Sequence, residues 1–111
     1  MKINQFDIWL ANLNSSKGTE PGKIRPVVVI QTDLLNGVHP STIVCPITTN
    51  VQPESEILRV HLRKSQLDKP SDILVDQIRS IDNHRLIQKL AKLTKEQAAS
   101  LKQNLQIVLD L

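Results

Sequence analysis

Apolar residues recur at every second position in several short segments of the chain, and this pattern predicts β-strands. Residues 6–11 and 57–62 alternate in this way, whereas 26–30 is a continuous, mostly β-branched run. Such a run is typical of a strand that is buried on both faces. Residues 42–48 and 71–81 complete the predicted strands. Pro46 cannot donate to a ladder, so the pattern places it at a sheet edge or a bulge.

The spacing of apolar residues changes at the end of the chain, from a period of two to that of a helix. Thr94 and Gln97 stand three residues apart, as in the capping box that opens many helices. One helical stripe then follows, made of Ala98, Leu101, Leu105, Val108 and Leu109. A short helical turn is expected within residues 82–90.

Turn-forming residues separate the strands. Residues 12–24 are rich in Asn, Ser, Gly and Pro, and Asn36-Gly37 marks a turn within 34–40. The first of these loops is long enough for a functional role. No repeat or interdomain linker is visible, so residues 1–111 are predicted to form one domain. We expect a mainly β fold, a strongly bent antiparallel sheet or open barrel, with the terminal helix packed against it.

Composition narrows the classes of function. Phe6 and Trp9 are the only aromatic residues, which argues against an RNA-binding module built on rows of stacking rings. The net charge of +3 and the pI near 9.2 are compatible with a nucleic-acid substrate. The densest basic stretch, residues 59–64, is interpreted as a solvated strand end.

Several kinds of site are disfavoured. Cys45 is the only cysteine, so neither an intramolecular disulfide nor a cysteine-based metal cluster can form. The three histidines are not spaced as metal ligands, and no Gly-rich phosphate loop, paired glycosidase carboxylates or nucleophile elbow is found. No metal or other cofactor is therefore expected. No segment reaches bilayer length, so we expect a cytoplasmic protein without membrane contact.

Polar residues at strand ends are the candidates for chemistry. Arg25 stands immediately before the apolar run, and a guanidinium can bind phosphate with two parallel hydrogen bonds. The alternative, which is the commoner case for a single arginine, is a bridge from the strand end to a carboxylate. Thr48 closes the strand 42–48, where its hydroxyl could point to a ligand or cap the turn at Asn50.

A second polar group interrupts the strand predicted at residues 71–81. The period of two places Asp76 and Ile78 on one face and Gln77 and Arg79 on the other. A salt bridge or a buried hydrogen-bond network explains these residues as well as a binding role does.

Four segments in register carry a family resemblance: FDIWL at 6–10, KGTEPGKIRPVVV at 17–29, VCPIT at 44–48 and DQIRSID at 76–82. Together they closely resemble the PemK/MazF family of toxin endoribonucleases from bacterial toxin–antitoxin systems. The resemblance runs from Phe6 through the terminal helix. Two departures stand out. Phe6 occupies a position that is usually glycine, and Glu20-Pro21-Gly22-Lys23-Ile24 replaces the frequent Glu-Gln-Gly-Gly, which bears on cleavage preference.

The resemblance implies an SH3-like barrel that forms a homodimer and cuts single-stranded RNA, such as mRNA, at short sequences without metal. Arg25 would stabilise charge on the scissile phosphate, Thr48 would hydrogen-bond the reacting group, and Glu20 is a candidate base. Contacts to RNA would come from Lys17, Asp76, Gln77 and Arg79. An acidic antitoxin is the implied partner. Two alternatives remain, a toxin of the same fold that inhibits a topoisomerase and an RNA-binding homologue without activity.

Overall fold

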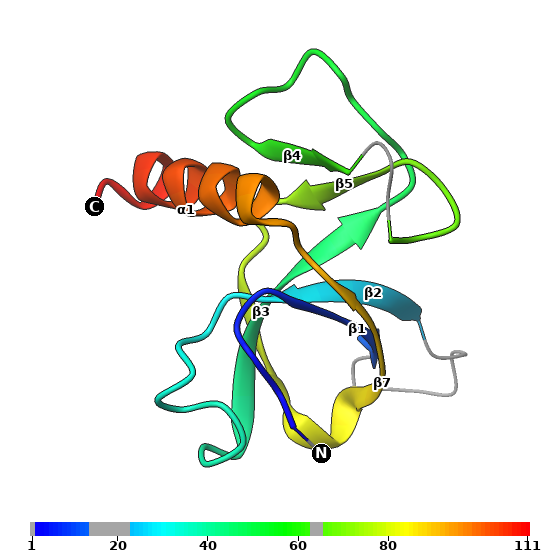
Figure 1. Ribbon diagram of the computed structural model, residues 1–111, viewed down its shortest axis with the longest axis vertical. Helices are drawn as coiled ribbons and strands as arrows, with labels where there is room; N and C mark the ends of the chain where they lie inside the picture. The colour runs from blue at the N-terminus through cyan, green and yellow to red at the C-terminus, as the bar shows by residue number, and fades with distance from the viewer. Residues whose placement is uncertain (1, 14–22, 63–65) are drawn as a thin grey trace.

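The computed structural model describes residues 2–13, 23–62 and 66–111 (Figure 1). Its elements are seven strands, one 3₁₀ turn and one helix: β1 Asp7–Asn12, β2 Ile24–Val29, β3 Ser41–Thr48, β4 Arg59–Leu62, β5 Ser71–Leu74, β6 Arg79–Asp82, η1 Asn83–Arg85, β7 Leu86–Lys92 and α1 Lys95–Leu109. The strands form one antiparallel sheet in the order β4-β5-β3-β2-β1-β7, and β6 pairs with β3 beside this path. The predicted mainly β fold with a terminal helix is confirmed.

Strand β3 organises the sheet because it changes partner along one edge. Its first half pairs with β6, its last two residues pair with β5, and its other edge pairs with β2. Pro46 therefore lies in a central strand, and the prediction of an edge position was wrong. The N–H of Ile30 donates to the carbonyl of Ile43, so by alternation the nitrogen of Pro46 faces away from β2. The N–H that Pro46 lacks would therefore point to the gap between β5 and β6, so its absence costs no ladder hydrogen bond.

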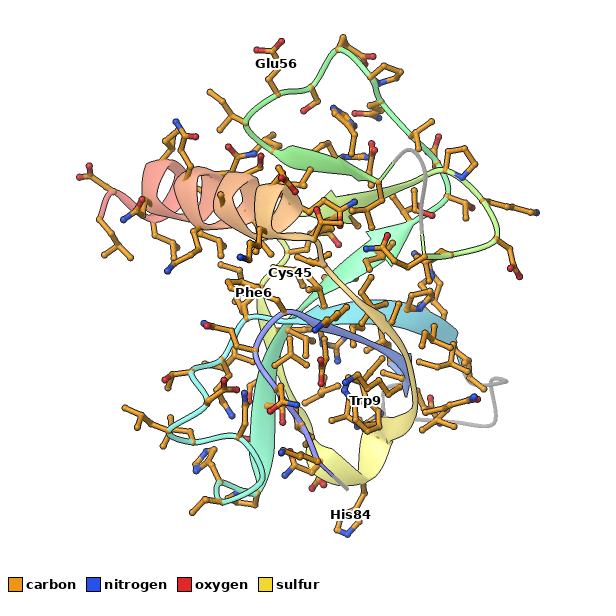
Figure 2. The ribbon with its side chains drawn as sticks, in the orientation of Figure 1. Phe6, Trp9, Cys45, Glu56 and His84 are labelled. Atoms are coloured by element: carbon orange, nitrogen blue, oxygen red, sulfur yellow. The ribbon has the colours of Figure 1, made fainter. Side chains whose placement is uncertain are left out.

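Both faces of the central strands are buried, as the apolar run at 26–30 predicted. On one face Val28 and Cys45 pack with Leu101 of the helix, and on the other Trp9 and Val27 pack with Leu86 of β7. Figure 2 shows Cys45 on the side of α1 and Trp9 on the side of β7. This two-sided burial holds β2 and β3 firmly on both faces.

Helix α1 begins as its sequence predicts. Thr94 and Gln97 form a reciprocal capping box, and Leu101 is fully buried against the sheet. Ala98, Leu105 and Val108 pack on the same cluster, but Leu109 is 49% exposed. The predicted stripe is therefore one residue too long.

Two differences from the predicted strands concern the last third of the chain. The strand expected at 71–81 is two strands, β5 and β6, because β3 offers them separate halves of its edge. Strand β7 was not predicted, since Leu86–Lys92 lacks a period of two; it forms by pairing with β1 across two register shifts. The helical turn expected within 82–90 is η1, whose cap is Asp82.

Candidate active site

A cavity of about 340 Å³ opens where β2, β3 and the start of β6 meet. Lys23, Arg25 and Arg79 bring three cationic side chains to it, and Gln77 adds an amide. Among the described residues, no carboxylate lines this basic cavity. Converging cations without a neighbouring acid attract a polyanion, and phosphate is the group that a guanidinium fork fits best.

Arg25 is half-buried at the second position of β2. Its partner in β1 is Ala11, a small buried residue. Within residues 2–13, 23–62 and 66–111, no side chain forms an ion pair with Arg25. The alternative in which Arg25 bridges the strand end to a carboxylate therefore has no support among these residues.

Thr48 ends β3 and is half-buried, but it does not line the basic cavity. The register of β2 and β3 pairs Val27 with Pro46. The ladder ends at this pair, and the period of two places Arg25 on the face of Val27 and Thr48 on the face of Pro46, each two residues beyond it. The hydroxyl of Thr48 also accepts a hydrogen bond of 3.1 Å from the N–H of Asn50, so the turn-capping role is confirmed. That hydroxyl keeps its own proton to donate.

The polar residues after β5 are brought to the cavity by a turn rather than by a strand. The N–H of Gln77 donates to the carbonyl of Leu74 across this turn. Gln77, Ile78 and Arg79 all line the cavity, whereas Asp76 is exposed and does not. The predicted division of these four residues between two strand faces was wrong, because the strand ends at Leu74.

Lys17 and Glu20, the two remaining candidates, lie outside the described residues. Lys23 was not proposed as a site residue, although it lines the basic cavity. Its signal was its place two residues before Arg25, which puts both side chains on one side of an extended chain.

A second group of polar residues, the Asp72 cluster, was also missed. Asp72 is fully buried in β5 and forms ion pairs with Arg59 at 3.0 Å and with His61 at 2.7 Å. Burial raises the pKa of Asp72, but hydrogen bonds from Gln52, His61 and Arg59 outweigh it and hold the pKa below its ordinary value. Arg59 and His61 are thus paired residues, and the interpretation of 59–64 as a solvated strand end was wrong for these two.

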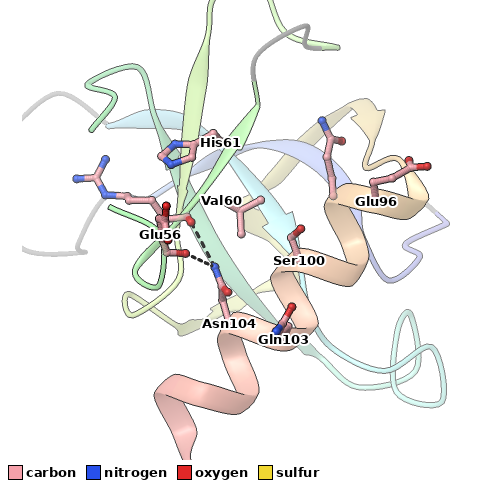
Figure 3. A pocket seen from close by; sticks show the side chains of 9 residues that line it. Glu56, Val60, His61, Glu96, Ser100, Gln103 and Asn104 are labelled. Atoms are coloured by element: carbon pink, nitrogen blue, oxygen red, sulfur yellow. Dashed lines mark hydrogen bonds between the residues drawn. The ribbon is translucent and has the colours of Figure 1, made fainter. Parts of the chain in front are cut away.

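A larger groove of about 440 Å³ runs between β4 and α1 (Figure 3). Asn104 of the helix donates to the carbonyls of Glu56 and Arg59 and so joins the two walls. Glu56 and Glu96 place two carboxylates on its lining. These acids make the groove less suited to a phosphate than the basic cavity.

The described residues contain no group of three or more His, Cys, Asp or Glu side chains arranged to hold a metal ion. None of the helices described here is both long and apolar enough to cross a membrane.

Similarity to known proteins assigns the chain to a family. Residues 4–109 match the model of the PemK-like, MazF-like toxins of type II toxin–antitoxin systems. The chain belongs to this family. A relative from Staphylococcus saprophyticus named Endoribonuclease MazF is 39% identical, and the match covers 98% of this chain and 92% of the relative.

Solved structures of MazF proteins share the fold of this PemK/MazF family member. The MazE–MazF structure (Form-II) from Deinococcus radiodurans aligns with a TM-score of 0.84 at 23% identity, over 100% of this chain and 98% of that one. The Mycobacterium tuberculosis toxin MazF-mt6 aligns with a TM-score of 0.79 at 24% identity, over 95% and 97% of the two chains.

Proposed function

We propose that this chain is an endoribonuclease toxin that cuts single-stranded RNA, mRNA in the cytoplasm, at a short sequence without a metal ion. The observation that carries the proposal is the basic cavity, where Lys23, Arg25 and Arg79 converge and no described carboxylate competes with phosphate. Family membership and the relative named as an endoribonuclease support the same activity.

The reaction needs no group from outside the RNA and the protein. The 2′-oxygen attacks the adjacent phosphorus and gives up its proton to a base. The bond from phosphorus to the 5′-oxygen breaks, and that oxygen leaves with a proton. The products are a 2′,3′-cyclic phosphate and a 5′-hydroxyl.

Each candidate residue has a role that suits its chemistry. The guanidinium of Arg25 stabilises the negative charge that grows on the phosphate oxygens, and the hydroxyl of Thr48 is proposed to donate to the same group. Glu20 is the proposed base. Lys17, Lys23, Asp76, Gln77 and Arg79 are proposed to contact the RNA on either side of the cleaved bond.

A cleavage assay separates this proposal from its two alternatives. The purified protein is incubated with a long single-stranded RNA in excess EDTA, and the ends of the products are determined. We expect cleavage at a recurring short sequence, with cyclic phosphate and 5′-hydroxyl ends. An inactive homologue would bind the RNA and leave it whole, and a topoisomerase inhibitor would leave it whole and unbound. Either result would contradict the proposal.

A homodimer is proposed as the working form. At the end of α1, Ile107 and Leu111 are 52% and 85% exposed, and Ile57 and Leu58 are half-exposed just before β4. Exposed apolar side chains on a small sheet protein favour burial against a second copy. Sedimentation at tens of micromolar should give twice the mass of the chain, and a monomer there would sink this part of the proposal.

The proposed partner is a small acidic antitoxin with a segment that folds on binding. An acidic chain would compete with RNA for the cations of the basic cavity. Binding of the cognate antitoxin should therefore slow RNA cleavage. If it bound without slowing cleavage, competition at this cavity would be the wrong model.

A further inference from the structure

The Asp72 cluster stands beside the proposed site on the side of β3 away from β2. Asp72 is the ladder partner of Thr48 in the pairing of β3 with β5. On the other edge of β3, Pro46 pairs with Val27 of β2 and lines the basic cavity together with Arg25. The end of β3 is therefore held between the basic cavity and the Asp72 cluster.

The carboxylate of Asp72 accepts hydrogen bonds from three groups of the protein. One carboxylate oxygen accepts from the N–H of Gln52 at 2.8 Å and from Arg59 at 3.0 Å, and the other accepts from Nδ1 of His61 at 2.7 Å. A fully buried carboxylate is stable only with such partners. Because Gln52 belongs to the segment after Thr48, the buried charge is also an anchor for that segment.

The two partners of Asp72, Arg59 and His61, add anchors of their own. Arg59 donates to the carbonyl of Asn50 at 2.9 Å, and Nε2 of His61 faces the carbonyl of Ser55 at 2.9 Å. Both ring nitrogens of His61 thus face oxygen acceptors, and only the doubly protonated ring donates to both. The loop of residues 49–55 is fixed at three backbone atoms, the oxygens of Asn50 and Ser55 and the nitrogen of Gln52.

Thr48 is tied to the same loop, because its hydroxyl accepts from the N–H of Asn50. If the loop becomes more mobile, the hydroxyl of Thr48 therefore becomes more mobile as well. A reacting group that moves by about 1 Å can lose as much as 100-fold in rate.

We propose that Asp72, His61 and Arg59 are positioning residues of the ribonuclease site, which hold the loop 49–55 and through it the hydroxyl of Thr48. The proposal rests on the proposed function, since it assigns these residues a part in the cleavage reaction. None of the three touches RNA in this account, and they act through Thr48 alone.

A double-mutant cycle with Thr48 tests the proposal. Rates at saturating RNA and KM are measured for D72N, H61Q and T48A, and for D72N and H61Q combined with T48A. Asp72→Asn and His61→Gln should each slow the maximal rate roughly 10- to 100-fold with a smaller change in KM. In the T48A background the same changes should cost less than about twofold, because the hydroxyl that they misplace is gone.

A control and a second readout separate positioning from general damage. His84→Gln removes an exposed histidine whose Nδ1 lies 2.8 Å from Asp82, at the end of the molecule opposite Glu56 (Figure 2), and it should cleave at the wild-type rate. Amide exchange at Asn50 and Gln52 should speed up in D72N and H61Q while exchange in β2 is unchanged. Should D72N fail to fold, H61Q and R59K carry the same cycle.

If D72N or H61Q slows cleavage by the same factor in the T48A background as in the wild type, the positioning role is overturned. Wild-type rates in both D72N and H61Q would overturn it as well. In those cases T48A alone remains slow and the proposed function survives. A wild-type chain that does not cut RNA would overturn the proposed function and this proposal together. A T48A variant as fast as the wild type would overturn this proposal and leave the proposed function standing.

Discussion

Two groups of basic side chains lie near the end of β3, and they differ in whether the protein supplies an anion for them. Arg59 and His61 close around the buried carboxylate of Asp72, and each also contacts a loop carbonyl. Lys23, Arg25 and Arg79 converge on a cavity to which the described residues contribute no carboxylate. The residue types are nearly the same. What distinguishes a structural cluster from a binding site is whether the protein itself supplies the anion.

Among the substitutions that test this comparison, replacing Arg25 should have the largest effect on the cleavage rate. Charge stabilisation at the phosphate acts mainly in the transition state, so Arg25→Ala should lower the rate about 100- to 1,000-fold and change RNA affinity much less. Arg25→Lys keeps the charge but loses the planar fork, and it should stay well below the wild type. Cleavage rates at saturating RNA and the Kd for RNA check both. Full activity in Arg25→Ala would remove the central residue of the mechanism.

Replacing Asp72 should instead lower the stability of the folded protein. Asp72→Asn leaves Arg59 and His61 without their carboxylate, and breaking a buried pair costs about 3 kcal/mol of unfolding free energy. Urea denaturation measures this cost. Asp82→Asn, which alters the exposed pair with His84, should cost far less. Equal losses in the two variants would show that the buried pairs of Asp72 stabilise the fold no more than the exposed pair of Asp82.

Because the pKa of Asp72 is lowered in the folded protein, the stability that its carboxylate contributes should depend on pH. A carboxyl whose pKa is lower in the folded state contributes stability above its ordinary value of 3.8, and that contribution is lost as the pH falls through the lower folded value. The stability of the wild type should therefore fall more steeply below pH 3.8 than that of Asp72→Asn. Parallel curves would show that the charge of Asp72 does not stabilise the fold.

The smallest effects should come from the outer cations of the basic cavity. Lys23→Ala and Arg79→Ala should each weaken RNA binding and reduce the slope of log K against log salt by about 0.7, the value for one phosphate contact on a single strand. Lys102→Ala on α1 removes the same charge away from the cavity and serves as the control. Slopes that match the wild type in both cavity variants would place the RNA elsewhere.

The parts of this structure that the sequence predicts are those governed by local patterns. The apolar run of β2 requires burial on both faces, and the capping box at Thr94 marks the start of α1. Strand β7 and the division of 71–81 escaped prediction because they depend on which edges β1 and β3 offer, and these edges are set by the sheet as a whole.

The site shows the same limit. Arg25 and Thr48 follow from their places at strand ends, but their relation to each other needed the register of β2 and β3. The Asp72 cluster joins residues 11 to 20 positions apart and cannot be assembled from spacing alone. Its signal was a lone carboxylate within the apolar stretch SDILV at residues 71–75, which a buried strand tolerates only with partners.

The central claim is that the basic cavity cuts RNA by attack of the substrate's own 2′-oxygen. The most direct test uses two oligonucleotides that carry the cleavage sequence and differ only in a 2′-deoxyribose at the cleaved position. We expect the wild-type protein to bind both with similar Kd and to cut only the all-ribose strand, in excess EDTA, leaving a 2′,3′-cyclic phosphate. Rapid cutting of the deoxy-substituted strand at the same bond would contradict the account.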